Sequence, residues 1–197
     1  AAPRIPTITQ KQVATFLSPR PRDSHKGKFG TVAVIGGASG MVGAPLLAAR
    51  AALKLGAGCV HVGILADNAP SVDILQPELM LHSAQTALRL PKLDVLAIGC
   101  GLGHDDAAQQ ILQDALKLDT LLVLDADALN ILSLRPDLRT ALISRKNASI
   151  MTPHPGEAAH LLGCNTEAVQ AARSEAAQEL AKRFHSVVVL KGAHSLC

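Results

Sequence analysis

Apolar positions along the chain gather in short continuous runs that are rich in Val, Ile and Leu. Runs of this kind predict strands that are buried on both faces of a sheet. The predicted strands span residues 31–35, 59–64, 93–98, 121–124, 149–151 and 186–190.

Segments with helical patterns separate these runs. We expect helices at 9–17, with Thr9 as a possible cap, at 45–55, at 105–118, in the segment that ends at 162, and at 167–184 after a Thr166 cap. The segment 67–78 is ambiguous and is interpreted as a helix broken before Pro77. Short strands that alternate with helices predict an α/β fold in three layers, with a mostly parallel sheet and helices on both faces.

Length and composition agree with one folded domain, 1–197, that begins with a polar lead-in at 1–23. The 197 residues are 48% hydrophobic and 18% charged, enough for a core without disulfides or metals. Four widely spaced cysteines without a metal-binding pattern predict free thiols and a cytoplasmic location. Apolar runs are far shorter than the roughly 18 residues of a membrane span.

The charge and the aromatic content of the chain argue against nucleic acid as a partner. The net charge is only +3, with one basic cluster at 20–28, and the chain has three Phe and no Trp or Tyr on which bases could stack. An anionic small molecule is the better prediction.

Polar or Gly-rich segments follow five of the predicted strands within a residue or two. They are 36–45, 99–103, 125–130, 152–157 and 191–195. In an open α/β sheet, ligands bind beyond the carboxyl ends of the strands, so we expect these segments to form one ligand site.

The glycine loops could approach a phosphate closely, but neither matches a known fingerprint. The loop at 36–43 lacks the Gly-x-Gly start of dinucleotide-binding folds, the loop at 99–103 is followed by His104, and the Walker sequence is absent. Each loop alone is more often a tight turn than a phosphate cradle.

Candidate charged groups each keep an ordinary structural alternative. Asp125 and Asp127 could hold Mg²⁺ through water or bond a sugar hydroxyl, although Asp127 could equally cap a helix. Lys191, before Gly192 and Ala193, could bind nucleotide phosphates or could close an edge strand.

The stretch 149–157, which ends in Thr-Pro-His-Pro-Gly-Glu, is where we expect the site to be organised. Pro153 and Pro155 hold the backbone extended and so direct the imidazole of His154. The alternative is a plain strand-to-helix turn, with Glu157 in the first helical turn, where it favours the helix dipole.

In combination these segments resemble the ADP/ATP-dependent NAD(P)H-hydrate dehydratase family, a branch of the ribokinase-like fold. The resemblance runs from about residue 24 to 195 and rests on His-Lys-Gly-Lys-Phe-Gly (25–30), the two glycine loops, Gly-Ala-Pro (43–45), Asp-Ala-Asp-Ala-Leu-Asn (125–130), His-Pro-Gly-Glu (154–157) and Lys-Gly-Ala (191–193). Met41 stands where many members have Tyr.

The resemblance implies an enzyme that restores hydrated NADH or NADPH (NADHX, NADPHX) to the reduced cofactor, with ADP or ATP as phosphoryl donor and Mg²⁺. It implies that hydrated cofactor contacts Ala44, Gly103 and His154, and that nucleotide contacts Lys191, Gly192, Ala193, His194 and Ser195. Glu157 and Asp125 are the implied catalytic residues, and any Mg²⁺ would be held through them.

Family members carry a further Gly-rich segment with the main catalytic Asp, which we expect beyond Cys197. We therefore expect the chain to be a fragment. The resemblance also implies that an epimerase domain could be fused to it, as in some family members. We further expect identical chains to associate. The alternatives are a ribokinase-like kinase of a small alcohol, which stops at the phosphorylated product, and a non-catalytic nucleotide or cofactor sensor.

Overall fold

The computed structural model describes residues 6–17 and 19–197 and contains one seven-stranded sheet. Its strand order is β3-β2-β1-β4-β5-β6-β7, and every neighbouring pair is parallel. The strands are β1 (Thr31–Gly36), β2 (Cys59–Ile64), β3 (Met80–Ser83), β4 (Val95–Ile98), β5 (Leu121–Leu124), β6 (Ser149–Met151) and β7 (Val187–Val188). The predicted three-layer α/β class is confirmed.

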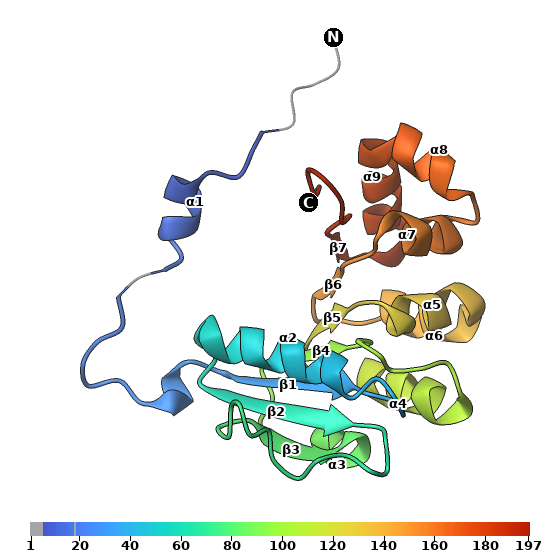
Figure 1. Cartoon of the computed structure of the whole chain (residues 1–197). Coiled ribbons are helices and arrows are strands. Elements are labelled where there is room, and N and C mark those ends of the chain that lie inside the picture. Colours follow the sequence, from blue (N-terminus) through green and yellow to red (C-terminus); the bar gives the residue numbers. More distant parts are fainter. Residues whose placement is uncertain (1–5, 18) are drawn as a thin grey trace.

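Helices follow most strands and cover both faces of the sheet (Figure 1). They are α1 (Gln10–Ala14), the 3₁₀ helix η1 (Lys26–Lys28), α2 (Gly43–Lys54), α3 (Ala84–Leu88), α4 (Asp106–Leu116), α5 (Asp127–Leu134), α6 (Pro136–Ile143), α7 (Pro155–Leu162), α8 (Thr166–Ala171) and α9 (Arg173–Phe184). Helix α2 lies on one face with Val34, Val60 and Val62 beneath it, while the helices from α3 onward enclose the larger core on the other face.

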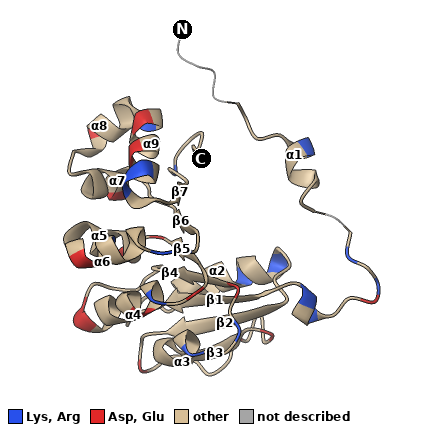
Figure 2. Cartoon of the chain, turned by 180° about the vertical axis from the view of Figure 1, so that it is seen from behind, with Lys and Arg blue, Asp and Glu red and all other residues tan. Residues whose placement is uncertain are grey.

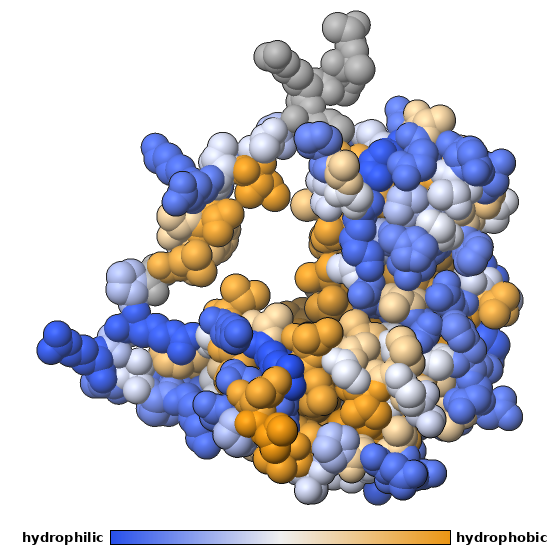
Figure 3. Space-filling model, in the orientation of Figure 1, coloured by the Kyte–Doolittle hydropathy of each residue, from blue (hydrophilic) through white to orange (hydrophobic). Residues whose placement is uncertain are grey.

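The face that carries α2 is only partly covered. One cross-strand row on it starts at Val62 and Val34, which are 0% and 2% exposed, and ends at Ile150 and Val187, which are 36% and 54% exposed. Figure 3 shows apolar surface on this side of the molecule, turned toward the lead-in. The sheet is therefore enclosed on both sides at β1 and β2 but on one side only at β5 to β7.

The prediction of a helix within 67–78 is wrong, because this segment consists of turns and bends. Asp73 explains the difference. Its carboxylate accepts a hydrogen bond from Leu75 N at 3.0 Å and forms a two-point pair with Arg50 of α2, at 2.7 and 2.8 Å. Side-chain bonds to the local backbone compete with a helix, and two prolines shorten the segment further.

The predicted long helix 167–184 is also divided. Asn165, not Thr166, caps α8 by accepting from Ala168 N at 2.8 Å. The chain then leaves helical geometry at Ala172 (φ −136°, ψ 53°) and starts again as α9. The predicted strand 186–190 pairs with β6 only at Val187 and Val188. Strand β3, the 3₁₀ helix η1 and helices α3, α5 and α6 were not among the elements predicted from the sequence.

The described part of the lead-in stands apart from the sheet and contains the short helix α1 (Figure 1). Thr9 caps α1 through Gln12 N, as expected, but the helix ends at Ala14 and buries no residue. Residues 1–5 of the predicted lead-in lie outside the described residues. Basic segments follow the lead-in toward β1, whereas acidic ones recur along the helices from α4 to α9 (Figure 2). None of the described helices combines the length and the apolar character that crossing a membrane requires.

Candidate active site

The two glycine loops meet at the point where the strand order reverses. From β1 the chain moves outward to β2 and β3, and then returns to place β4 on the other side of β1. Ala38 N donates to Gly101 O at 2.7 Å, and Gly37 N donates to Cys100 O at 3.2 Å. Residue 36 must be glycine, because a Cβ there would collide with the Cys100 carbonyl. This reversal is where open α/β sheets form a ligand crevice.

Two of the three predicted substrate residues lie where these two loops meet. Ala44 is in the first turn of α2, and its Cβ is 3.3 Å from the position that a Cβ on Gly101 would take. Gly103 has a left-handed backbone (φ 81°), and its N–H donates to Asp127 Oδ2 at 2.9 Å. The other oxygen of Asp127 lies 3.3 Å from His104 Nε2. Asp127 thus ties the β4 loop to the start of α5.

The turn between β5 and α5 is strained. Ala126 has φ 47° and ψ −119°, which lies outside the regions that L-residues populate readily. It is also the N-cap of α5 and offers no side-chain cap, so the interpretation of Asp127 as the cap is wrong. Residue 99 must be glycine, because its φ is 126° and a Cβ would strike the Asp125 carbonyl. The strained turn directs Asp125 and Asp127 to opposite neighbours, Lys191 and the β4 loop.

His154 and Glu157 form a reciprocal cap at the start of α7. His154 Nδ1 accepts from Gly156 N at 3.0 Å and from Glu157 N at 3.4 Å, while Glu157 Oε2 accepts from His154 N at 2.7 Å. Since Nδ1 accepts, the proton of the neutral imidazole belongs on Nε2, which lies 3.3 Å from Glu157 Oε1. The imidazole is therefore held in one orientation and is more than half exposed, whereas Glu157 is buried.

Lys191 connects the loops of three neighbouring strands. Its Nζ lies 2.5 Å from Asp125 Oδ1, after β5, and 3.9 Å from Glu157 Oε2, after β6, and Lys191 itself follows β7. The backbone supports this reach, because Lys191 N donates to Pro153 O at 2.8 Å. Three of the predicted site residues are thus brought into one charged network. Within the described residues, no hydrogen bond joins this network to Ala44 or Gly103.

The predicted nucleotide loop, Lys191 to Ser195, is a closed turn. Leu190 and Leu196 pair across its base, and Ser195 Oγ donates to Gly192 O at 3.3 Å. Gly192 and His194 both have positive φ, at 147° and 61°.

Arg173 holds this loop and was missed in the sequence analysis. From the first position of α9, its guanidinium donates to the carbonyls of Leu190, Lys191 and His194 at 3.2 to 3.3 Å. A cation at a helix N-terminus interacts unfavourably with the helix dipole. An arginine at this position could therefore have indicated, from the sequence, a contact outside the helix. The break before α9 places it within reach of the loop.

Cys100 is a second residue that the sequence analysis did not place in the site. Its Sγ is 3.8 Å from Asp125 Oδ2. Burial, with the adjacent Asp125 carboxylate, raises the pKa of the Cys100 thiol, so the neutral form is favoured. The thiol acts as a neutral donor beside the charged network.

The donor set suits Mg²⁺ only as an ion that keeps its waters and arrives with phosphate. Among the described residues, no three His, Cys, Asp or Glu side chains gather as metal ligands. Asp125 and Glu157 supply carboxylates, but the ammonium of Lys191 lies between them. Mg²⁺ commonly binds one or two carboxylates plus substrate phosphates, which fits these residues better than an all-protein cage.

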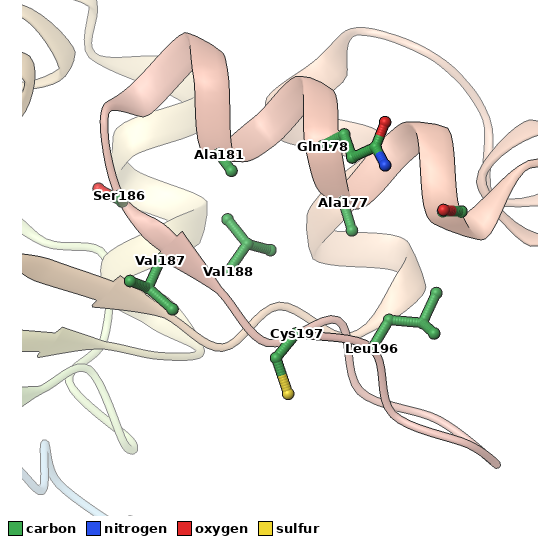
Figure 4. A pocket seen from close by; sticks show the side chains of 9 residues that line it. Ala177, Gln178, Ala181, Ser186, Val187, Val188, Leu196 and Cys197 are labelled. Carbon is green, nitrogen blue, oxygen red and sulfur yellow. The ribbon is translucent and has the colours of Figure 1, made fainter. Parts of the chain in front are cut away.

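The apolar hollow between α9 and β7 is a separate feature (Figure 4). It measures about 380 Å³ and is lined by Ala177, Ala181, Val188 and Leu196 among others. No charged side chain lines it, so it lacks the groups that phosphoryl chemistry requires.

Comparisons with known proteins agree with this geometry. The family model described as NAD(P)H-hydrate dehydratase matches residues 32–197. The ADP-dependent (S)-NAD(P)H-hydrate dehydratase of Neisseria meningitidis is 46% identical over 180 residues, covering 90% of this chain and 60% of that protein. The bifunctional NAD(P)H-hydrate repair enzyme Nnr of Coxiella burnetii is 43% identical over 190 residues, covering 94% of this chain and 38% of that protein.

A solved structure is also similar. The ADP/ATP-dependent NAD(P)H-hydrate dehydratase of Bacillus subtilis, co-crystallised with ATP and Mg²⁺, has a TM-score of 0.81 at 31% identity, covering 98% of this chain and 69% of that one. This chain therefore spans less than two thirds of the length of the two curated relatives.

Proposed function

The chain belongs to the NAD(P)H-hydrate dehydratase family, with a ribokinase-like fold, and we propose that it serves the nucleotide-dependent dehydration of hydrated NADH or NADPH to the reduced cofactor. The observation that carries this proposal is the network of Lys191, Asp125 and Glu157 at the carboxyl edge of the sheet. It lies at the same edge of the sheet as the junction of the β1 and β4 loops, the point of strand-order reversal at which open α/β sheets bind ligands.

The chemistry explains why a nucleotide is needed. Hydroxide leaves a carbon atom poorly, whereas a phosphate ester leaves readily, and each 1.36 kcal/mol removed from the barrier gives about a tenfold rate increase. The nucleotide transfers a phosphoryl group to the ring hydroxyl. Loss of that phosphate from its ring carbon, together with loss of a proton from the neighbouring carbon, then restores the double bond of the reduced ring. Such a reaction needs positive charge around the transferring group.

We assign Lys191 and the loop Gly192, Ala193, His194 and Ser195 to the nucleotide phosphates. The Lys191 ammonium is more than a third exposed and is paired with two carboxylates, so it can turn toward a phosphate without crossing a desolvation barrier. Arg173 engages loop carbonyls, and none of the hydrogen bonds among the described residues uses the N–H groups of residues 192–195, so these groups are available to a ligand.

Asp125 and Glu157 are assigned to the metal-phosphate side, where Mg²⁺ carried by the nucleotide would supply charge neutralisation. Ala44, Gly103 and His154 are assigned to the hydrated nicotinamide ring. The reciprocal cap with Glu157 fixes the His154 ring before any ligand arrives, which lowers the entropic cost of using it.

The remaining features of the whole protein are also proposals. We propose a single domain preceded by the lead-in at 1–23, a cytoplasmic location, association of identical chains, and the fusion to an epimerase domain that the resemblance implies. The names of the bifunctional relatives support the last of these, since they describe a repair enzyme with two activities.

The test uses the protein as its gene encodes it. Hydrated NADPH is incubated with Mg²⁺ and either ADP or ATP, and the absorbance of the reduced nicotinamide ring is followed. Recovery that requires nucleotide supports the proposal. A stable phosphorylated product without recovery would instead identify a kinase, and tight binding of both ligands without turnover would identify a sensor.

A further inference from the structure

A groove between α5 and α7 lies next to Gly103, which is assigned to the hydrated nicotinamide ring. It measures about 630 Å³, within the range of small-molecule sites, and is lined by His104, Asn130, Ser133, Leu134, Ala159, His160, Gly163 and Cys164. His104 adjoins Gly103 in the chain, and Asp127 ties both to α5. The groove therefore begins where the proposed site for the hydrated ring ends.

The two helices carry the groove away from the sheet edge. Both helices begin at the carboxyl edge of the sheet, α5 with Asp127 and α7 beside Glu157. A helix rises about 1.5 Å per residue, so Ser133 and Gly163 lie about 9 Å along the helices from these two acids. A ligand that reacts at the edge and fills the groove must therefore be long, with a second recognisable group at its far end.

The lining selects the chemistry of that second group. None of the lining residues is Lys, Arg, Asp or Glu, so the groove suits an uncharged moiety and not a phosphate. Asn130 is half-buried, and none of the hydrogen bonds among the described residues uses its carboxamide. An asparagine carboxamide can pair with the N6 and N7 edge of adenine, and an imidazole such as that of His160 offers a face on which a base can stack.

From these observations we infer that the α5–α7 groove binds the adenosine half of the hydrated dinucleotide. The inference rests on the proposed function, which places the hydrated ring of the same molecule at Gly103. In this arrangement the groove selects a dinucleotide over a nicotinamide mononucleotide, and Asn130 and His160 determine that selectivity.

The experiment uses the protein as its gene encodes it and compares two ligands, hydrated NADH and hydrated nicotinamide mononucleotide in its reduced form, by calorimetric titration. The dinucleotide is expected to bind at least tenfold more tightly. Asn130→Ala and the exposed His160→Ala should each weaken dinucleotide binding by about fivefold or more, because a lost base contact costs on that order. Mononucleotide and ADP affinities should stay unchanged.

Asn147→Ala is the matched control. Asn147 bonds Asp119 near the amino end of the sheet, far from the groove, and its loss should leave both ligands unaffected. His160→Ala keeps the test valid if Asn130→Ala fails to fold, because the side chain is exposed. Equal affinities for the two ligands, or a loss of ADP affinity in the variants, would overturn this inference but not the proposed function. Failure of both hydrated ligands to bind would refute the proposed function instead.

Discussion

Replacing Ala126 by glycine should stabilise the protein, although glycine usually does the opposite. Ala126 joins the two acids of the β5–α5 turn with φ 47° and ψ −119°, a conformation that costs an L-residue about 1–3 kcal/mol and costs glycine little. Against this gain, the more flexible glycine stabilises the unfolded chain by about 0.4–1 kcal/mol. The net expectation is a gain of about 1 kcal/mol in the free energy of unfolding.

The assay is urea unfolding, with thermal unfolding as a second readout. A gain of that size corresponds to a melting temperature about 2–4 °C higher in a chain of this length. The same substitution in an ordinary helix is the control. Ala141 is exposed in α6, and Ala141→Gly should cost about 1 kcal/mol through helix propensity.

Opposite signs for the two substitutions would establish that the turn at Ala126 stores strain. If Ala126→Gly destabilised the protein as much as Ala141→Gly does, the strain reasoning would be refuted. The turn positions Asp125 and Asp127, so a stabilised variant that bound nucleotide more weakly would indicate that the strain serves the site.

Three further predictions concern single groups. His154→Ala should raise KM for the hydrated cofactor and leave the fold intact. His154→Asn keeps a side chain that can cap α7 and should raise KM as well. A normal KM in the asparagine variant would show that His154 serves only as the cap of α7. Cys164 is exposed and should react with iodoacetamide well before Cys100, because partial burial and a raised pKa protect the Cys100 thiol. Mass spectrometry of labelled peptides measures the two rates, and equal rates would contradict the predicted protection of Cys100. The hydrogen bonds from Arg50 lower the pKa of Asp73 in the folded protein. The stabilisation from this pair is therefore present above the unfolded pKa of about 3.9 and is lost as the pH falls through the lower folded pKa. The difference in urea midpoint between wild type and Asp73→Asn should shrink in acid, and a constant difference would show that the Arg50–Asp73 pair does not cause it.

Six of the seven strands, and the gathering of the polar segments at one edge of the sheet, could be predicted because both depend on local patterns. Buried parallel strands are short apolar runs, and the polar segments after them share one edge whatever the strand order. The pairing of Lys191 with Asp125 could not be predicted, because the residues are 66 positions apart and meet only through the order β5-β6-β7. Sequence patterns do not encode that order.

Other elements escaped prediction because tertiary contacts decide them. Strand β3 has three half-exposed residues and one exposed residue, so no buried apolar run marks it, and its pairing with β2 defines it. The break at Ala172 lies inside a sequence with good helix propensity, and contacts of Arg173 with the loop carbonyls compensate for it. In both places a long-range interaction outweighs a local preference.

The incomplete cover of the sheet sets a gradient of local stability across the molecule. Strands β1 and β4 have hydrogen-bonded neighbours on both sides, whereas in the described part of the chain β7 pairs with β6 alone, at two residues. Backbone amides should therefore exchange with deuterium slowly at β1 and quickly at β7, where local opening requires the least energy. The nucleotide loop follows β7, so a ligand that joins Lys191 to Asp125 and Glu157 would slow exchange there, because it would tie the end of β7 to the loops that follow β5 and β6.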